Sequence, residues 1–319
     1  MPEPDMTAGY SALVNGFCDV ADICYRAGKL NEATRLLRGG MELIEQAPDG
    51  AVDVRDRARL ALAFGAILDH RTFYANVDYD LALETAGRAE VLAGMANSTR
   101  LSADAADLAG LIRYNRALNL GEGSYDEALM FFRRALVIRE GLNDTHGIAE
   151  SLFHVGLIHE RLGQTDEARK QYEAALETAT AHGHKLEESY ARRHLAGIAQ
   201  EAGDLGTALA GFQRSLALRE ELGYRILLPL SLLAVGDVLL AQNNDAAALE
   251  YFQRANDLAE TMDIPLAQLF VLLSLGATKQ KAGEIEVARD HYQRALVLAE
   301  ANSFNEGITA AREALAALP

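Results

Sequence analysis

The chain has 319 residues, half of them hydrophobic, with only 6 Pro, no Trp and a net charge of −16. Its abundant Ala and Leu favour helices, and the composition excludes a disordered, collagen-like or all-β chain. Lys and Arg are not clustered in either half. Because direct nucleic-acid binding needs such clusters to displace counterions, DNA and RNA are disfavoured as partners.

Residues 1–12 are predicted to form a polar N-terminal tail without the basic and apolar stretches of a signal peptide. The longest apolar run, between Arg225 and Asp237, is too short to span a membrane. Cys18 and Cys24 lie six apart, on different faces of a predicted helix, and are expected to stay reduced. We therefore expect a cytoplasmic protein that does not insert into a membrane.

Three helix pairs are predicted next, over residues 14–50, 58–98 and 103–144. In the second and third pairs extra residues separate the two helices, at 69–80 and 114–125. Insertions in a repeat array map to loops on one edge, often the functional edge. They are expected either to lengthen the helices and pack on each other, or to form an edge contact patch from the aromatic residues Phe73, Tyr74, Tyr79 and Tyr125.

A forty-residue period is plain from the third pair onward. An Ala is followed four residues later by an aromatic residue and three further on by a small one, which places all three on one helix face. A small residue also precedes each of the last four alanines by twelve positions. The alanines are Ala128, Ala168, Ala208, Ala248 and Ala288; the aromatic residues are Phe132, Tyr172, Phe212, Phe252 and Tyr292; the preceding small residues are Gly156, Ala196, Gly236 and Gly276.

Gly163, Gly203, Asn243 and Gly283 suit the left-handed turn that ends a helix, so each unit is predicted to be an antiparallel helix pair. The later pairs are expected over 149–184, 189–224, 229–264 and 269–302. Residues 305–318 are expected to form a lone capping helix, which an open-ended stack requires. The predicted fold is all-α, a solenoid of about seven helix pairs plus this cap.

The small–Ala–aromatic–Ala pattern resembles the tetratricopeptide repeat family over residues 13–302, in its forty-residue variant known from bacterial regulatory arrays. The resemblance implies a right-handed superhelix whose first helices line a concave groove. The early Trp and the closing Pro of the family pattern are missing here.

In this family the groove positions fall at fixed offsets from the small residue of each first helix. The resemblance therefore implies a peptide- or protein-binding groove formed by Asp22, Tyr25, Arg59, Asp69, Asp104, Asp107, Tyr114, Glu150, Phe153, Leu157, Tyr190, Arg193, Leu230, Leu233, Asp237 and Phe270.

Aspartates dominate the early part of this groove and leucines the late part. A segment with basic and apolar anchors would suit both, unless neighbouring helices or the cap simply cover the apolar end. Self-association is a further option.

Motifs that carry chemistry are missing. The chain has no Walker loop, no His-Glu-x-x-His motif, no paired Cys-x-x-Cys motif and no Gly-x-Ser-x-Gly turn. His154 and His159 lie five apart, which is not the spacing of two metal ligands on one helix face. We therefore expect no catalytic residue, no metal and no cofactor.

Two functions remain. The first is a non-catalytic scaffold or adaptor that binds a protein or peptide in the concave groove, since stacked repeats present a long recognition surface. The second is a regulator that senses a ligand or signal peptide, with the curvature of the array controlling a partner.

Overall fold

The computed structural model describes residues 6–319, and this part of the chain is all α-helical, as predicted. The helices are α1 (Met6–Arg26), α2 (Leu30–Glu45), α3 (Val54–Ala75), α4 (Tyr79–Met95), α5 (Thr99–Leu120), α6 (Tyr125–Gly141), α7 (Thr145–Arg161), α8 (Thr165–His182), α9 (Lys185–Glu201), α10 (Leu205–Glu221), the 3₁₀ turn η1 (Arg225–Leu227), α11 (Leu228–Ala241), α12 (Asp245–Thr261), α13 (Pro265–Lys281), α14 (Ile285–Ala301) and α15 (Asn305–Ala316).

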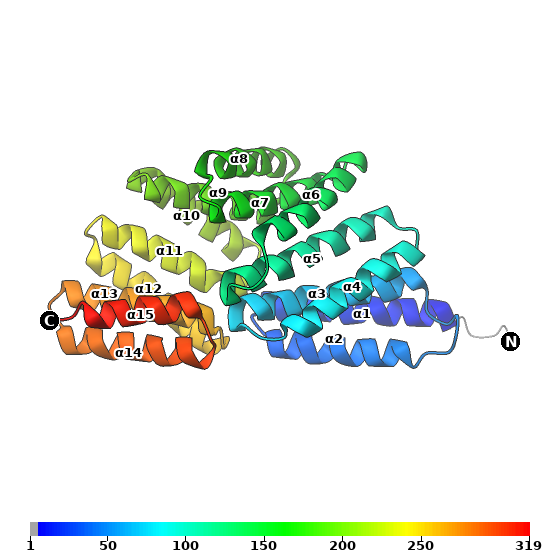
Figure 1. Cartoon of the computed structure of the whole chain (residues 1–319), viewed down its shortest axis with the longest axis horizontal. Helices are drawn as coiled ribbons and strands as arrows, with labels where there is room; N and C mark the ends of the chain where they lie inside the picture. The colour runs from blue at the N-terminus through cyan, green and yellow to red at the C-terminus, as the bar shows by residue number, and fades with distance from the viewer. Residues whose placement is uncertain (1–5) are drawn as a thin grey trace.

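Each helix packs on the next, so that α1–α14 form seven pairs and α15 covers the last of them (Figure 1). The predicted tail is wrong for residues 6–12. Residues 1–5 lie outside the described part, but α1 begins at Met6, and residues 6–12 are helical because Tyr10 packs against the core of the first repeats.

In the third, fourth, sixth and seventh pairs a glycine of the first helix is needed because the aromatic ring of the second helix lies directly on it. A Cβ atom at Gly236 would lie 2.5 Å from the ring of Phe252, and one at Gly276 would lie 2.4 Å from the ring of Tyr292. The ring of Phe252 is fully buried. The same contact is made by Gly110 with Phe132 and by Gly156 with Tyr172, and it accounts for the glycines of the repeat pattern.

The extra residues of the second and third pairs lengthen the first helices, so that α3 and α5 have 22 residues each, against 17 in α7. The lengthened ends pack on each other: the Tyr79 hydroxyl accepts a hydrogen bond from Asn119 Nδ2 at 3.0 Å. Tyr79 and Tyr74 are buried and Phe73 is half-buried. The expected edge patch is therefore wrong: Phe73 and Tyr74 lie on the lengthened end of α3, not on an exposed loop, and Tyr79 is buried as the first residue of α4.

The array bends until its two ends meet (Figure 1). Helix α3 contacts α13, and α5 contacts α15. Asn76, which ends α3, donates through Nδ2 to the carbonyl oxygens of Asn302 at 2.9 Å and Ser303 at 3.1 Å. The turn at Gly28 lies against Met262, and Ile226 and Ile264 share one buried cluster with the first helices. The solenoid is closed by contact between its first and last repeats.

Gly28→Leu is expected to open this closure. A Cβ at Gly28 would lie 2.1 Å from Met262 Sδ, and the residue also has a φ of +81°. Gly50→Leu is the matched control, because Gly50 has a φ of +74° and no atom within 4 Å of its Cβ position. Small-angle X-ray scattering should show a larger radius of gyration for Gly28→Leu than for Gly50→Leu. Equal radii would contradict closure through this contact.

Candidate functional site

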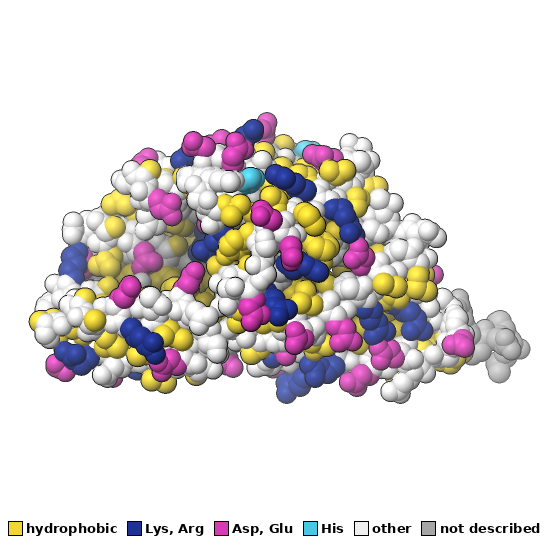
Figure 2. Space-filling model, in the orientation of Figure 1, with side chains coloured by type: hydrophobic (Ala, Val, Ile, Leu, Met, Phe, Trp, Pro, Cys, Tyr) yellow, Lys and Arg dark blue, Asp and Glu magenta, His cyan; other side chains and the backbone are white. Residues whose placement is uncertain are grey.

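The first helices surround a central cavity of about 930 Å³. Residues of α1, α3, α5, α7, α9, α11 and α13 line it, together with the start of α15. Between α11 and α7 the surface is hollowed and bordered by hydrophobic side chains (Figure 2). The volume lies in the usual range of small-ligand sites.

Most of the residues expected in the groove line this cavity, because the 3.6-residue period places them on the inner face of each first helix. Asp22 instead pairs with Arg26, Arg59 pairs with Asp56 at 3.2 Å, and Asp237 accepts from Ser274 Oγ at 2.7 Å. None of these three lines the cavity, whereas the lining includes Tyr25, Asp69, Asp104, Asp107, Tyr114, Glu150, Phe153, Leu157, Tyr190, Arg193, Leu230, Leu233 and Phe270.

The acidic residues of α5 and α7 surround one buried cation, Arg139 of α6. Its guanidinium lies 3.1 Å from Asp104, 3.4 Å from Asp107 and 2.8 Å from Glu150. Its Nη1 also donates to Ser151 Oγ at 2.7 Å. The acid cluster is thus partly neutralised from within the protein, which the sequence did not reveal because Arg139 lies on a second helix.

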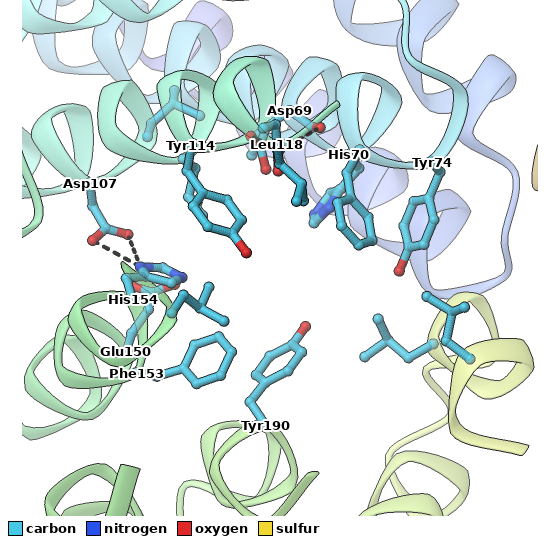
Figure 3. Close-up of a pocket in the computed structure, with 18 of the residues that line it drawn as sticks. Asp69, His70, Tyr74, Asp107, Tyr114, Leu118, Glu150, Phe153, His154 and Tyr190 are labelled. Carbon is cyan, nitrogen blue, oxygen red and sulfur yellow. Dashed lines mark hydrogen bonds and ion pairs between the residues drawn. The ribbon is translucent and has the colours of Figure 1, made fainter. Parts of the chain in front are cut away.

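His154 completes the cluster, and Figure 3 shows its contact with Asp107. The two groups are 3.0 Å apart; burial opposes charge on both, yet the attraction raises the pKa of His154 and lowers that of Asp107. Asp107, Glu150 and His154 have the donor types and spacing for a cation. The guanidinium of Arg139 already supplies the positive charge that a bound metal ion would bring to these carboxylates.

Asp69, on the neighbouring helix α3, has no cation within ion-pair distance among residues 6–319. It is 5% exposed and accepts a hydrogen bond from Asn115 Nδ2 at 2.9 Å. Burial raises the pKa of its carboxyl from 3.8 to about 7. Because the folded-state pKa lies above the unfolded value, the folded state favours the neutral carboxyl. The stability that this carboxyl contributes is fully present below about pH 4 and is lost as the pH rises through 7.

Asp69→Asn is therefore expected to stabilise the fold above pH 7, by up to about 4 kcal/mol for a shift of about three units. The gain should become small toward pH 4, where Asp69 is neutral in the folded state and about half protonated in the unfolded state. Urea unfolding at pH 4, 6 and 8 measures it, with the exposed loop residue Asp49→Asn as control. A gain that does not depend on pH would contradict the assignment.

Tyrosine hydroxyls and apolar side chains form the rest of the wall. Tyr74, Tyr114 and Tyr190 point their hydroxyls into the cavity (Figure 3). Burial raises the pKa of Tyr74 to about 12, so it stays a neutral donor. Tyr25 stacks on His70 with ring centroids 4.2 Å apart, and burial lowers the pKa of His70 to about 4, so this ring is uncharged.

The sequence missed several wall residues, Arg219 of α10 and Phe304 among them. Arg219 lies on a second helix, outside the inner-face offsets, and Phe304 comes from the segment before α15. The one signal that could have identified Arg219 is its spacing of 80 residues, or two periods, from Arg139.

No curated protein matches the chain in sequence. Among solved structures, NprR in complex with its cognate peptide NprX is 14% identical over 97% of this chain and 83% of that one, with a TM-score of 0.63. The Rap conjugation gene regulator of plasmid pLS20, in complex with the Phr* peptide, is 14% identical over 96% and 93%, with a TM-score of 0.59. Aspartyl phosphate phosphatase F from Bacillus subtilis is 15% identical over 94% and 78%, with a TM-score of 0.54.

These likenesses show a shared fold. No helix within residues 6–319 is long and apolar enough to cross a bilayer. A family model for the tetratricopeptide repeat matches residues 111–181 and 187–261, where the forty-residue period is clearest. The chain therefore contains tetratricopeptide repeats, and its helices have the fold of a tetratricopeptide-repeat solenoid.

Proposed function

We propose that this protein is a regulator that binds a short peptide inside the closed array. The observation that carries the proposal is the central cavity, which is about 930 Å³ in volume and lies inside a ring whose first and last repeats are in contact. An open groove along the array would suit a long partner segment, whereas a cavity of this volume inside a ring favours a short one. Of the two functions that the sequence leaves open, the geometry favours ligand sensing.

The cavity wall supports a peptide ligand. Buried tyrosine hydroxyls and the Asn115 amide can bond to a peptide backbone, while Leu230, Leu233 and Phe270 offer an apolar surface to side chains. NprR and the pLS20 Rap regulator, which share the fold, were solved with peptides. Basic anchors on the ligand are less favoured, because Arg139 and His154 already neutralise the aspartates of α5.

Binding would act on the closure of the array. Repeats in a solenoid contact mainly their neighbours, so the contact between α3 and α13 is an extra one that a ligand can strengthen. The ligand would touch both ends, since α1 and α3 form one side of the cavity and α11 and α13 the other. It shifts the equilibrium toward the closed form to the extent that it binds that form more tightly.

We also propose that the protein is not an enzyme and acts in the cytoplasm. Asp107 and Glu150 are held in ion pairs, and the sequence has none of the nucleophile or metal motifs that would work with another buried cavity acid, Asp69. The cysteines Cys18 and Cys24 are both unpaired, as a reducing compartment requires.

Thermal melting tests the proposal. A lysate of the source cells is passed through a membrane that retains proteins, and each fraction is added to the purified protein. We expect the filtrate to raise the melting temperature of the wild type, because a ligand that binds the folded state stabilises it. Leu157→Trp, which fills the cavity, should show no shift, whereas Leu162→Trp on the exposed end of α7 should behave as wild type. A shift caused only by the retained fraction would contradict the proposal.

A further inference from the structure

Three arginines line the central cavity without a carboxylate within ion-pair distance in the described residues, although the chain has a net charge of −16. They are Arg161, Arg193 and Arg219. Arg161 donates to the Tyr114 hydroxyl at 3.2 Å. An unpaired cation taken out of water is costly. Arg193 and Arg219 are close enough for the charge of one to act on the other, so the pair calls for an explanation.

Arg219 is buried in α10 with only neutral partners. It donates through Nη1 to Ser231 Oγ at 2.7 Å and through Nε to Ser189 Oγ at 3.2 Å. Its guanidinium carbon lies 5.0 Å from the centre of the Tyr190 ring. Burial lowers the pKa of Arg219 to about 10, which still leaves the group charged at neutral pH.

Arg193 of α9 is the second cation. Its one polar contact in the described chain is a long one, 3.5 Å from Nη1 to His194 Nε2. Burial lowers its pKa, and its charge acts on Arg219 in turn. The charge of Glu160 offsets part of the burial cost of Arg193, but in the described chain no carboxylate lies within ion-pair distance of either arginine.

Arg139, two repeats earlier, can be compared directly with Arg219. Arg139 and Arg219 are 80 residues, or two periods, apart, and so are the serines that they bind, Ser151 and Ser231. Both hydrogen bonds measure 2.7 Å. The two arginines thus occupy the same position in repeats three and five, and both are buried.

Their surroundings differ at every acidic position. Arg139 is paired with Asp104 and Asp107, which lie six and three residues before Gly110, and with Glu150, which lies six before Gly156. The equivalent positions beside Arg219, counted from Ala196 and Gly236, hold Tyr190, Arg193 and Leu230. A phenol, a guanidinium and a leucine thus stand where three carboxylates stand two repeats earlier.

We infer that Arg193 and Arg219 together bind a carboxylate of the ligand, in the place that acidic side chains occupy around Arg139. This inference rests on the proposed function and defines the ligand further. The forked, planar guanidinium matches a carboxylate with two parallel hydrogen bonds. The apolar side chains of Leu230 and Leu233 line the cavity in the same region, so the carboxylate sits beside an apolar part of the ligand.

Synthetic peptide pools test the inference. Three pools of N-acetylated short peptides are compared: free acids without Asp or Glu, the same sequences as C-terminal amides, and amides with one internal Glu. Native mass spectrometry records which peptides the wild type retains. We expect the free acids or the Glu peptides to be retained and the amides without Glu to be lost. The pool that is retained shows whether the carboxylate is terminal or a side chain.

Arg193→Gln is the main variant, because Arg219 also holds two serines in place. It should weaken retention of the carboxylate peptides at least about tenfold, as expected for the loss of one charge-assisted hydrogen bond. Arg254→Gln is the control, since Arg254 lies outside the cavity lining and pairs with Glu220 at 3.2 Å on the surface. It should retain the pools as wild type does.

Melting without peptide separates a binding role from a structural one. Arg193→Gln should melt no lower than wild type, because it removes an unpaired cation and its repulsion of Arg219. Sodium acetate, compared with sodium chloride at equal ionic strength, should stabilise the wild type more than the variant.

The outcomes are distinct. Equal retention of acids and amides, or unchanged retention by Arg193→Gln, would overturn the carboxylate site and leave the proposed function standing. Failure of all pools to bind would overturn the short-peptide function. In that case a lower melting temperature of Arg193→Gln, or an equal acetate effect in both proteins, would also overturn the site.

Discussion

Arg139→Met is expected to destabilise the fold by about 3–5 kcal/mol at neutral pH, the usual cost of breaking a buried ion pair. The variant leaves Asp104, Asp107 and Glu150 without the guanidinium that lies within 3.4 Å of each. It also removes the donor to Ser151. Urea unfolding followed by circular dichroism measures the loss.

The same variant predicts a pH dependence. Without Arg139 the pKa values of the three carboxyls rise in the folded state, so their contribution to stability is lost as the pH rises through the new values. The deficit should therefore shrink as the pH falls toward 4. Arg254→Met is the control: Arg254 pairs with Glu220 at 3.2 Å on the exposed surface and should cost less than about 1 kcal/mol. Equal losses in the two variants would contradict the buried network.

Phe252→Ala is expected to cost about 3–5 kcal/mol, because it empties the space of a fully buried ring. Gly236→Ala should also destabilise, since its Cβ would lie 2.5 Å from that ring. In the Phe252→Ala background the new methyl group has room, so the double variant should be more stable than the sum of the single losses predicts. A double-mutant cycle in urea measures the difference, and simple additivity would contradict the ring-on-glycine contact. The exposed Val297→Ala should change stability by less than about 0.5 kcal/mol.

The helix pairs could be predicted because their determinants are local. Gly156 and Tyr172 lie within one repeat and meet through the spacing of a single helix pair. The inner-face positions follow from the same period, which is why residues such as Tyr114, Phe153 and Tyr190 were expected where they lie.

Closure could not be predicted, because it depends on contacts between the first and last repeats. Gly28 and Met262 are far apart in sequence, and neither carries a signal for the other. The groove charges were hidden for a related reason: Asp107 looks available in the sequence, but Arg139 and His154, from two other helices, satisfy it. Phe73 and Tyr74 were misplaced because five added residues extend a helix as easily as they form a loop.

The central claim is that the closed array binds one short peptide in its cavity. Native mass spectrometry of the wild type, mixed with the protein-free filtrate of its source cells, tests it most directly. The account predicts a single added mass of peptide size on the wild type and on Leu162→Trp, and none on Leu157→Trp. The same added mass on Leu157→Trp, or no added mass on the wild type, would contradict it.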